Sequence, residues 1–310
     1  MGQQVWTIGD TLAWCREYLV HHDDENPKLS AEWLLAGATG LSRIELYMHF
    51  DRPLSMEERD VLRETLKRRG AGEPLQYISG EAAFRHIVVK TSQGVLIPRP
   101  ETEVLVDVVL EGLADVEARR VLEVGCGTGC IACSLAREAG VQVVATDVSS
   151  EAVACARANV EMLGLEELVE VIECDCVDGV RGSFDCLVSN PPYIPSGELA
   201  ELPHEVMGFE PALALDGGAD GLVFFDRLVA EALPLVKDGG LFACELHETC
   251  LDEAARRLRM FDAKNEAFVR RMLALDAALQ AGDELAEPIT SALADELQAC
   301  ALRLNSADPA

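Results

Sequence analysis

The sequence predicts an α/β protein in which helices cover both faces of a mostly parallel sheet. An all-helical domain is expected before the sheet and an atypical helical tail after it. Three observations support this prediction. Apolar strands alternate with helices after about residue 100, only helical periodicity precedes residue 75, and no period-two alternation follows Met260.

Composition and charge exclude several classes of protein. The 310 residues are 49% hydrophobic and 26% charged, which is typical of a globular chain. With 26 basic against 54 acidic residues the net charge is −28, so the surface repels phosphate backbones and direct nucleic-acid binding is not expected. Because the chain has neither a bilayer-length apolar run nor a signal peptide, we expect a cytoplasmic protein away from membranes.

Eleven cysteines are many for a chain of this size. In a reducing compartment most of them serve as small buried apolar residues. Cys130 and Cys133 have the spacing of a zinc or redox pair, but they begin an apolar helix and no second clean pair supplies further ligands. We therefore expect helix packing at these positions and no metal site.

Residues 1–75 are predicted to form a separate helical domain. After a first helix near the N-terminus, helices are expected at 29–36 and 42–47, and Ser55 with Glu58 forms the capping box of a fourth. This fourth helix carries five basic side chains, Arg59, Arg63, Lys67, Arg68 and Arg69. They form either a solvated face or a contact surface for an acidic or RNA-bound partner.

A linker with a β-hairpin is predicted at 76–97. Glycines and a proline at 70–74 interrupt the helical pattern, and apolar runs at 87–89 and 95–97 flank a turn signal at 92–94.

Strands and helices alternate from residue 98 to residue 260, which defines the second domain. Strands are expected at 120–124, 141–146, 169–172, 184–189 and 240–246, and helices at 104–113, 131–139, 151–163 and 221–236.

The tail, residues 261–310, is predicted to be mainly helical. Its apolar residues recur at helical spacing, at Phe268, Val269, Met272, Leu273 and Leu279. Without further strands, the strand at 240–246 or a neighbour keeps an unpaired edge, which a helix of the tail would have to cover.

A glycine-rich turn follows the first strand of the second domain. It contains Gly125, Cys126, Gly127, Thr128 and Gly129, and glycines there permit a tight turn and close approach of the backbone to a ligand. Its G-x-G-x-G spacing differs from the G-x-G-x-x-G of dinucleotide-binding enzymes. With Glu123 before it, the pattern is E-x-G-x-G-x-G, which resembles motif I of S-adenosylmethionine methyltransferases. The alternative is that these glycines only make tight turns.

Two further strand ends complete a cofactor site of this kind. Asp147 ends the second strand, where an acid can accept hydrogen bonds from both ribose hydroxyls. The third strand leads to Cys176, which would lie beside the adenine.

Asn190, Pro191, Pro192 and Tyr193 follow the fourth strand. Two prolines stiffen the backbone and remove two N–H donors, which leaves carbonyl acceptors, an amide and an aromatic face. This set suits a planar NH₂ group, whose two hydrogens need two acceptors. Holding both N–H bonds would aim a weakly nucleophilic amide nitrogen at a methyl sulfonium. A proline turn capped by Asn190 is the simpler alternative.

Four segments decide between substrates. Residues 72–80, 95–103, 189–194 and 209–222 together closely resemble the HemK/PrmC family, the peptide chain release factor N5-glutamine methyltransferases. The resemblance covers about residues 5 to 258. It implies methyl transfer from S-adenosylmethionine to the glutamine of the Gly-Gly-Gln motif in class-1 release factors.

The resemblance also implies site residues. Gly125 to Gly129, Asp147, Cys176 and Asn190 would bind the cofactor. Asn190 to Tyr193 would hold the glutamine amide, and Arg99, Glu101 and Thr102 would line the site. Family members often have Thr in the glycine turn and a larger residue near position 176, so Cys126 and Cys176 are departures. The resemblance implies class-1 release factors as partners. Residues 1–75 are expected to recognise them, and we expect a monomer.

Other functions remain open at this stage. The enzyme could methylate glutamine in ribosomal protein L3, or an exocyclic amine of a nucleic acid, since Asn-Pro-Pro-Tyr alone does not fix the substrate. The family normally finishes its sheet with two antiparallel strands after a last helix, and the sequence from Met260 onward does not match them. A cofactor-binding protein without activity is therefore another alternative.

Overall fold

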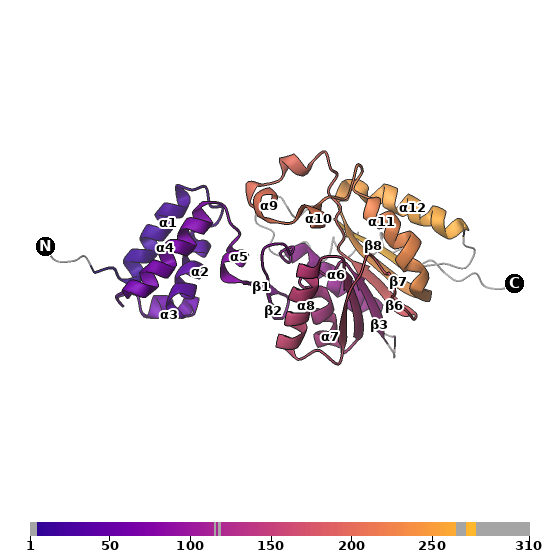
Figure 1. Ribbon diagram of the computed structural model, residues 1–310, viewed down its shortest axis with the longest axis horizontal. Coiled ribbons are helices and arrows are strands. Elements are labelled where there is room, and N and C mark those ends of the chain that lie inside the picture. Colours follow the sequence, from indigo (N-terminus) through magenta and orange to yellow (C-terminus); the bar gives the residue numbers. More distant parts are fainter. Residues whose placement is uncertain (1–4, 115, 117–118, 265–270, 277–310) are drawn as a thin grey trace. The chain divides into compact units, whose positions relative to one another are not determined.

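The computed structural model describes residues 5–114, 116, 119–264 and 271–276, and the chain forms two compact units (Figure 1). The first unit comprises the residues up to Glu81 together with Thr91–Gln93 and Leu202–Glu210. The second unit contains the rest of the described chain. None of the described helices is long and apolar enough to cross a membrane.

The first unit is helical, as predicted. Its helices are α1 (Ile8–Val20), α2 (Pro27–Thr39), α3 (Arg43–Met48), α4 (Met56–Gly70), α5 (Leu75–Ser79) and α9 (His204–Phe209). Capping boxes begin three of them, at Thr7, Ser42 and Ser55, so the predicted box at Ser55 is confirmed. An apolar cluster that includes Ile8, Leu19, Leu35, Leu46 and Leu66 holds these helices together.

Two of the basic side chains on α4 have structural partners. The Arg69 guanidinium is buried, and its Nη1 donates to Glu205 Oε2 at 2.9 Å and to the carbonyl oxygen of Glu73 at 2.9 Å. Its Nε pairs with Asp24 Oδ2. Arg68 makes two hydrogen bonds to the Glu73 carboxylate. These two arginines therefore tie the first unit together internally, including the segment 202–210, rather than forming a solvated basic face.

The second unit contains a six-stranded sheet. Its strands are β3 (Arg120–Val124), β4 (Gln142–Asp147), β5 (Val169–Glu173), β6 (Phe184–Ser189), β7 (Val236–Leu246) and β8 (Arg271–Asp276), in the order β5-β4-β3-β6-β7-β8. All five neighbouring pairs are parallel. The predicted parallel α/β core is therefore confirmed.

Helices cover both faces of this sheet (Figure 1). On one face lie α6 (Pro100–Gly112), α7 (Cys130–Ala139) and α8 (Ser150–Leu163). The other face packs against α11 (Val223–Arg227), the π turn η2 (Leu228–Ala232), the 3₁₀ turn η3 (Leu233–Leu235) and α12 (Leu251–Lys264). Neighbouring strand residues alternate between the two cores: Val121 packs on the first face and Leu122 on the second. Shorter pieces are η1 (Leu199–Glu201), α10 (Ala212–Leu215) and η4 (Glu248–Cys250).

The strand order places a switch point between β3 and β6. From β3 the chain adds β4 and β5 on one side, then returns to add β6 on the other. In sheets of this kind ligands bind outside the carboxyl ends of the two strands at that point. The glycine turn follows β3 and the Asn190 segment follows β6, so both predicted motifs meet there.

The hairpin differs from the prediction. Its strands are β1 (Glu81–Phe84) and β2 (Ile87–Lys90), joined by two residues, and 95–97 is not a strand. The turn forms at Arg85, which adopts φ +50° and makes ion pairs with Asp107 and Glu138. The turn predicted at 92–94 does form, with Gly94 at φ +89°, but residues 95–97 do not follow it as a strand.

The helical prediction for the tail is wrong at residues 271–276. These residues form β8, which pairs with β7 in continuous register from Leu241 opposite Arg271 to Leu246 opposite Asp276. The expected unpaired edge of β7 is therefore paired. In a short apolar run, periodicity alone does not distinguish a strand from a helix. The helical prediction for these residues failed for this reason. Helix α12 continues to Lys264, and the helical predictions for 265–270 and 277–310 lie outside the described residues.

Candidate active site

The glycine turn is built by three residues with left-handed backbone conformations. Gly125, Gly127 and Gly129 have φ of +77°, +55° and +75°. The N–H groups of Gly125 and Cys126 both donate to the carbonyl oxygen of Thr146, at 2.8 and 2.9 Å, which fixes the turn against β4. A Cβ added to Gly127 would meet no heavy atom of the described protein within 4 Å, so this side of the turn is open to a ligand.

Asp147 ends β4 beside this turn. Its Oδ2 accepts from the Gly127 N–H at 2.9 Å and its Oδ1 from the Ser149 N–H at 2.9 Å. Burial raises the pKa of this carboxyl, and these N–H groups oppose the rise. An ionised carboxylate has about four acceptor positions, so Asp147 keeps capacity for two hydroxyl groups.

Glu123, two residues before the glycine turn, is fully buried. Among the described residues neither of its carboxylate oxygens has a hydrogen-bond partner. Burial raises its pKa well above the ordinary value, and the charge of Asp147 adds to the rise while the nearby amide of Ala132 opposes it. Glu123 is the acid of the E-x-G-x-G-x-G pattern but is not among the site residues predicted from the sequence, although an acid within an apolar strand is a visible signal.

Asn190 follows β6 directly and lies next to the glycine turn. Ser189 anchors the end of the strand, because its hydroxyl donates to the carbonyl oxygen of Val124 at 2.6 Å. A Cβ on Gly125 would come within 4.0 Å of the Asn190 carbonyl oxygen. The Asn190 Nδ2 donates to Thr102 Oγ1 at 3.0 Å. Since Nδ2 is engaged, the amide oxygen Oδ1 is the group available as an acceptor.

A buried carboxylate joins the other predicted residues. Glu245, near the end of β7, accepts from Thr102 Oγ1 at 2.8 Å and from the Tyr193 hydroxyl at 3.1 Å. Arg99 and Glu101 lie close enough for their charges to act on it. Burial raises the pKa of Glu245 and also that of Tyr193. Glu245 is not among the site residues predicted from the sequence, since only the pairing of β7 with β6 brings it to them.

The loop at 216–222 packs backbone against backbone on the segment that contains Tyr193. The Gly217 N–H donates to the carbonyl oxygen of Ile194 at 2.8 Å. Gly221 has φ +74°, and a Cβ there would lie 2.4 Å from the Tyr193 carbonyl oxygen. Any larger residue at Gly221 would therefore displace the Asn190–Tyr193 segment.

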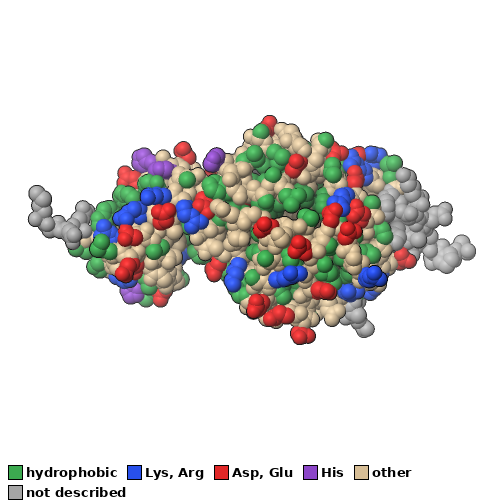
Figure 2. Space-filling model, in the orientation of Figure 1, with side chains coloured by type: hydrophobic (Ala, Val, Ile, Leu, Met, Phe, Trp, Pro, Cys, Tyr) green, Lys and Arg blue, Asp and Glu red, His purple; other side chains and the backbone are tan. Residues whose placement is uncertain are grey.

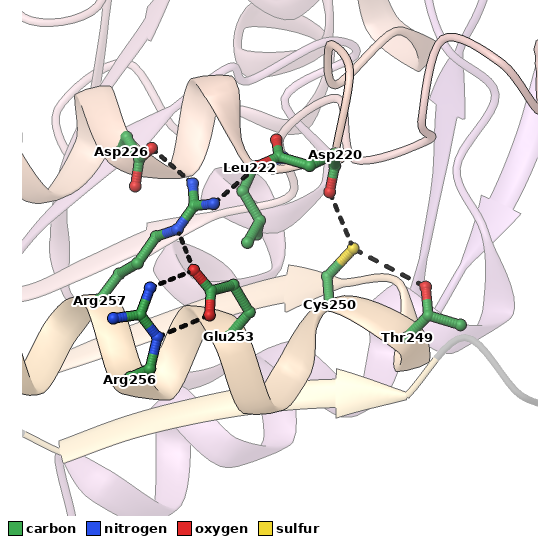
Figure 3. A network of polar contacts seen from close by, with 8 residues as sticks. All are labelled: Asp220, Leu222, Asp226, Thr249, Cys250, Glu253, Arg256 and Arg257. Atoms are coloured by element: carbon green, nitrogen blue, oxygen red, sulfur yellow. Dashed lines mark hydrogen bonds and ion pairs between the residues drawn. The ribbon is translucent and has the colours of Figure 1, made fainter.

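An ion-pair network on α12 holds this loop (Figure 3). The Arg257 guanidinium pairs with Asp220 at 2.6 Å, with Asp226 at 2.7 Å and with Glu253 at 2.8 Å. The Cys250 thiol donates to the Asp220 carbonyl oxygen at 3.4 Å. Helix α12 thus supports the loop that in turn positions Tyr193.

The cysteines that the resemblance assigned to the site are buried. Cys126 lies in the apolar cluster beneath α6, α7 and α8. Cys176 has φ +52° and packs in the opposite cluster, with Phe184 and Phe225 among its members. Cys130 and Cys133 are likewise buried, and burial raises the pKa of all four thiols. Their side chains therefore contribute to packing.

The residues around the glycine turn fit S-adenosylmethionine. The open side of Gly127 leaves room for close approach, and Asp147 retains acceptor capacity for ribose hydroxyls. Glu123 and Asp147 place two acids in the site, and S-adenosylmethionine is cationic at its sulfonium and amino groups. A nearby cation favours the ionised form of a buried carboxyl. The fold and this site define an S-adenosylmethionine-dependent methyltransferase.

Comparison with known proteins identifies the family. Residues 10–80 match the model of the PrmC N-terminal domain, and residues 98–206 match that of the methyltransferase small domain. A release factor glutamine methyltransferase of Chlorobaculum tepidum is 39% identical over 256 residues, which cover 79% of this chain and 87% of that protein. That of Geobacter sulfurreducens is 42% identical over 245 residues, covering 78% and 85%. The chain belongs to the release factor glutamine methyltransferase family.

A solved structure of the hMettl16 catalytic domain with a MAT2A 3'UTR hairpin also aligns with the chain. Its TM-score is 0.48 and its sequence identity 22%, over 56% of this chain and 66% of that one.

Proposed function

We propose that this protein transfers the methyl group of S-adenosylmethionine to the N5 amide nitrogen of the glutamine in the Gly-Gly-Gln motif of class-1 peptide chain release factors. One observation carries the proposal. Asn190 lies at the switch point beside the glycine turn, and its Nδ2 is engaged by Thr102, so Oδ1 is left as an acceptor for a substrate N–H.

The site suits a primary amide because it offers acceptors. Asn190 Oδ1 and the main-chain carbonyls of the Asn190–Pro192 segment accept the two N–H bonds, and neither proline has an N–H that would compete. Holding both bonds orients the nitrogen lone pair, and positioning of this kind is worth on the order of 7–11 kcal/mol. No residue needs to remove a proton before the attack, since an N–H proton can leave the nitrogen afterwards.

We assign the cofactor to the glycine turn and to Asp147. When bound, S-adenosylmethionine supplies an electrophilic methyl group on a sulfonium. Asp147 would accept from the ribose hydroxyls, and the Gly125–Gly129 backbone would approach the ligand closely. Cys176 would border the adenine through its backbone, because its side chain is buried.

Mass spectrometry of the reaction product tests the proposal. Intact release factor, ribosomal protein L3 and RNA are each incubated with enzyme and S-adenosylmethionine. We expect a gain of one methyl group on the glutamine of the Gly-Gly-Gln peptide. Methylation of L3 or RNA alone would refute the substrate, and cofactor binding without any transfer would favour an inactive binding protein.

The helical unit is proposed to recognise the protein substrate. Its α3 and the following turn expose large apolar side chains, with Ile44 74% and Met48 72% exposed. Ile44→Lys with Met48→Lys should raise KM for intact release factor without changing the rate on a short Gly-Gly-Gln peptide. Equal KM values for variant and wild type on the intact factor would exclude this role for α3.

We further propose that the enzyme acts as a monomer in the cytoplasm and without nucleic acid. The net charge of −28 opposes phosphate binding, and on the face shown in Figure 2 basic side chains lie scattered among acidic ones. All ten cysteines in the described part of the chain are unpaired, as suits a reducing compartment. Light scattering after size-exclusion chromatography tests whether the protein is a monomer. Titration with RNA tests whether it binds nucleic acid.

A further inference from the structure

We propose that Glu245 is a positioning residue that fixes the orientation of the Asn190 amide through the hydroxyl of Thr102. This inference rests on the proposed function, in which Asn190 Oδ1 accepts from the substrate amide. Glu245 lies on β7, Thr102 on α6 and Asn190 directly after β6. The hydrogen-bond series therefore joins three separate parts of the fold. Glu245 and Thr102 are 1% and 2% exposed, which keeps solvent from replacing either partner.

Two hydrogen bonds to Glu245 and one to Thr102 each have a defined direction. An ionised carboxylate only accepts, so the single hydrogen of the Thr102 hydroxyl is donated to Glu245 Oε2, at 2.8 Å. The Thr102 oxygen is then left as an acceptor, and it takes the Asn190 Nδ2 hydrogen at 3.0 Å. The Tyr193 hydroxyl occupies the other carboxylate oxygen at 3.1 Å.

This direction decides what Asn190 presents to a substrate. Because Thr102 accepts and does not donate toward Asn190, the amide nitrogen faces Thr102 and Oδ1 faces away. A flipped amide would present N–H groups to the N–H groups of a glutamine, where no hydrogen bond forms. Glu245 thereby selects the amide orientation that can bind a substrate, without contacting the substrate itself.

Protonation of Glu245 would remove this selection. A protonated carboxyl can donate to Thr102 Oγ1, which frees the Thr102 hydrogen to donate to a flipped Asn190. Burial raises the pKa of Glu245 and Glu101 adds to the rise, while Thr102, Tyr193 and Arg99 oppose it. On the β8 side the backbone partner of Glu245 is the apolar residue Leu275. We therefore expect transfer to weaken at acidic pH.

Variants of similar shape test the hydrogen-bond series from Glu245 through Thr102 to Asn190. Thr102→Val removes the hydroxyl and keeps the shape, Thr102→Ser keeps the hydroxyl, and Glu245→Gln removes the obligate acceptor. We expect Thr102→Val and Glu245→Gln each to lower kcat about 10- to 100-fold with the Kd for S-adenosylhomocysteine unchanged. Thr102→Ser should retain most of kcat. The double variant should lose no more than the worse single variant, since both act through one chain.

The pH profile separates positioning from a structural role. Wild-type kcat should fall on the acid side with an apparent pKa above the glutamate value of about 4.3, and this limb should disappear in Thr102→Val. Losses that multiply in the double variant, or a Thr102→Ser as poor as Thr102→Val, would overturn the proposal. Should Glu245→Gln fail to fold, the Val and Ser variants of Thr102 still decide it.

A measurement without substrate keeps this inference apart from the proposed function. In protein labelled with ¹⁵N-asparagine, the side-chain signal of Asn190 is assigned by its loss in Asn190→Asp. We expect Thr102→Val and Glu245→Gln to shift it, and Thr102→Ser to leave it in place. A wild type that methylates no release factor would refute the proposed function alone. An unshifted signal in both variants would refute the role of Glu245 alone.

Discussion

Gly127→Ala tests whether the glycine turn holds the cofactor through its backbone. Gly127 has φ +55°, and a Cβ there would contact no described protein atom within 4 Å. The folded protein therefore pays only the left-handed backbone penalty of about 1–2 kcal/mol, which corresponds to a fall in Tm of roughly 2–8 °C. The added methyl group does occupy the space through which a ligand would reach the backbone. We expect the Kd for S-adenosylhomocysteine to rise about tenfold or more, equivalent to about 1.4 kcal/mol.

Gly140→Ala is the matched control. Gly140 ends α7 with φ +62°, and a Cβ there also has no neighbour within 4 Å. Both variants should therefore lose similar thermal stability, measured by thermal unfolding, while calorimetric titration should show weakened binding only for Gly127→Ala. Equal Kd values for the two variants would refute the reasoning, because they would show that the ligand does not approach Gly127.

Four further predictions concern the site and its supports. Asn190→Ala should lower kcat about 10²- to 10³-fold, by analogy with the loss of one oriented hydrogen bond to a reacting group. Calorimetry should show an unchanged cofactor Kd, because the part of Asn190 beside the glycine turn is its carbonyl oxygen, which the substitution keeps. Asp147→Ala should weaken cofactor binding by roughly 1–3 kcal/mol, and an unchanged calorimetric Kd would place the ribose elsewhere. Arg257→Met should lower the free energy of unfolding by only about 1 kcal/mol, because its three ion pairs are partly exposed, yet raise protease cleavage within 216–222. Glu73→Gln should destabilise the protein at neutral pH. Because Arg68 lowers the pKa of Glu73, the difference should persist above the ordinary glutamate pKa and vanish as the pH falls through the lowered one, in urea titrations from pH 3 to 7.

Local chemistry explains why much of this fold was predictable. The capping box at Ser55 and the strand-turn-helix around Gly125–Gly129 depend on neighbours within a few residues, so their positions follow from the sequence. The same holds for the position of Asn190, which directly follows an apolar strand and precedes two prolines that lack the N–H groups to continue it. The family resemblance rested on such local motifs, and the comparisons confirm it.

Which buried acid joins the predicted site residues depends on how the strands pair. Glu245 is a single acid near the end of an apolar strand, and nothing near it in the sequence indicates its partners. Pairing of β7 with β6 brings Glu245 to Thr102 and Tyr193, which are separated from it by 143 and 52 residues. Contacts over such distances depend on how the strands are ordered, which local periodicity does not encode.

Strand β8, at the edge of the sheet, also formed in a way that local sequence does not determine. Residues 271–276 form a short, mostly apolar segment, and local periodicity alone does not distinguish a helix from a strand there. Its state was decided by β7, whose free backbone N–H and C=O groups are satisfied when β8 pairs with it over six residues. Arg69 is another example. The sequence shows only that this residue is basic, whereas folding buries it and places its guanidinium in ion pairs with Asp24 and Glu205. A side chain's chemistry is local, whereas its role depends on the partners that folding brings to it.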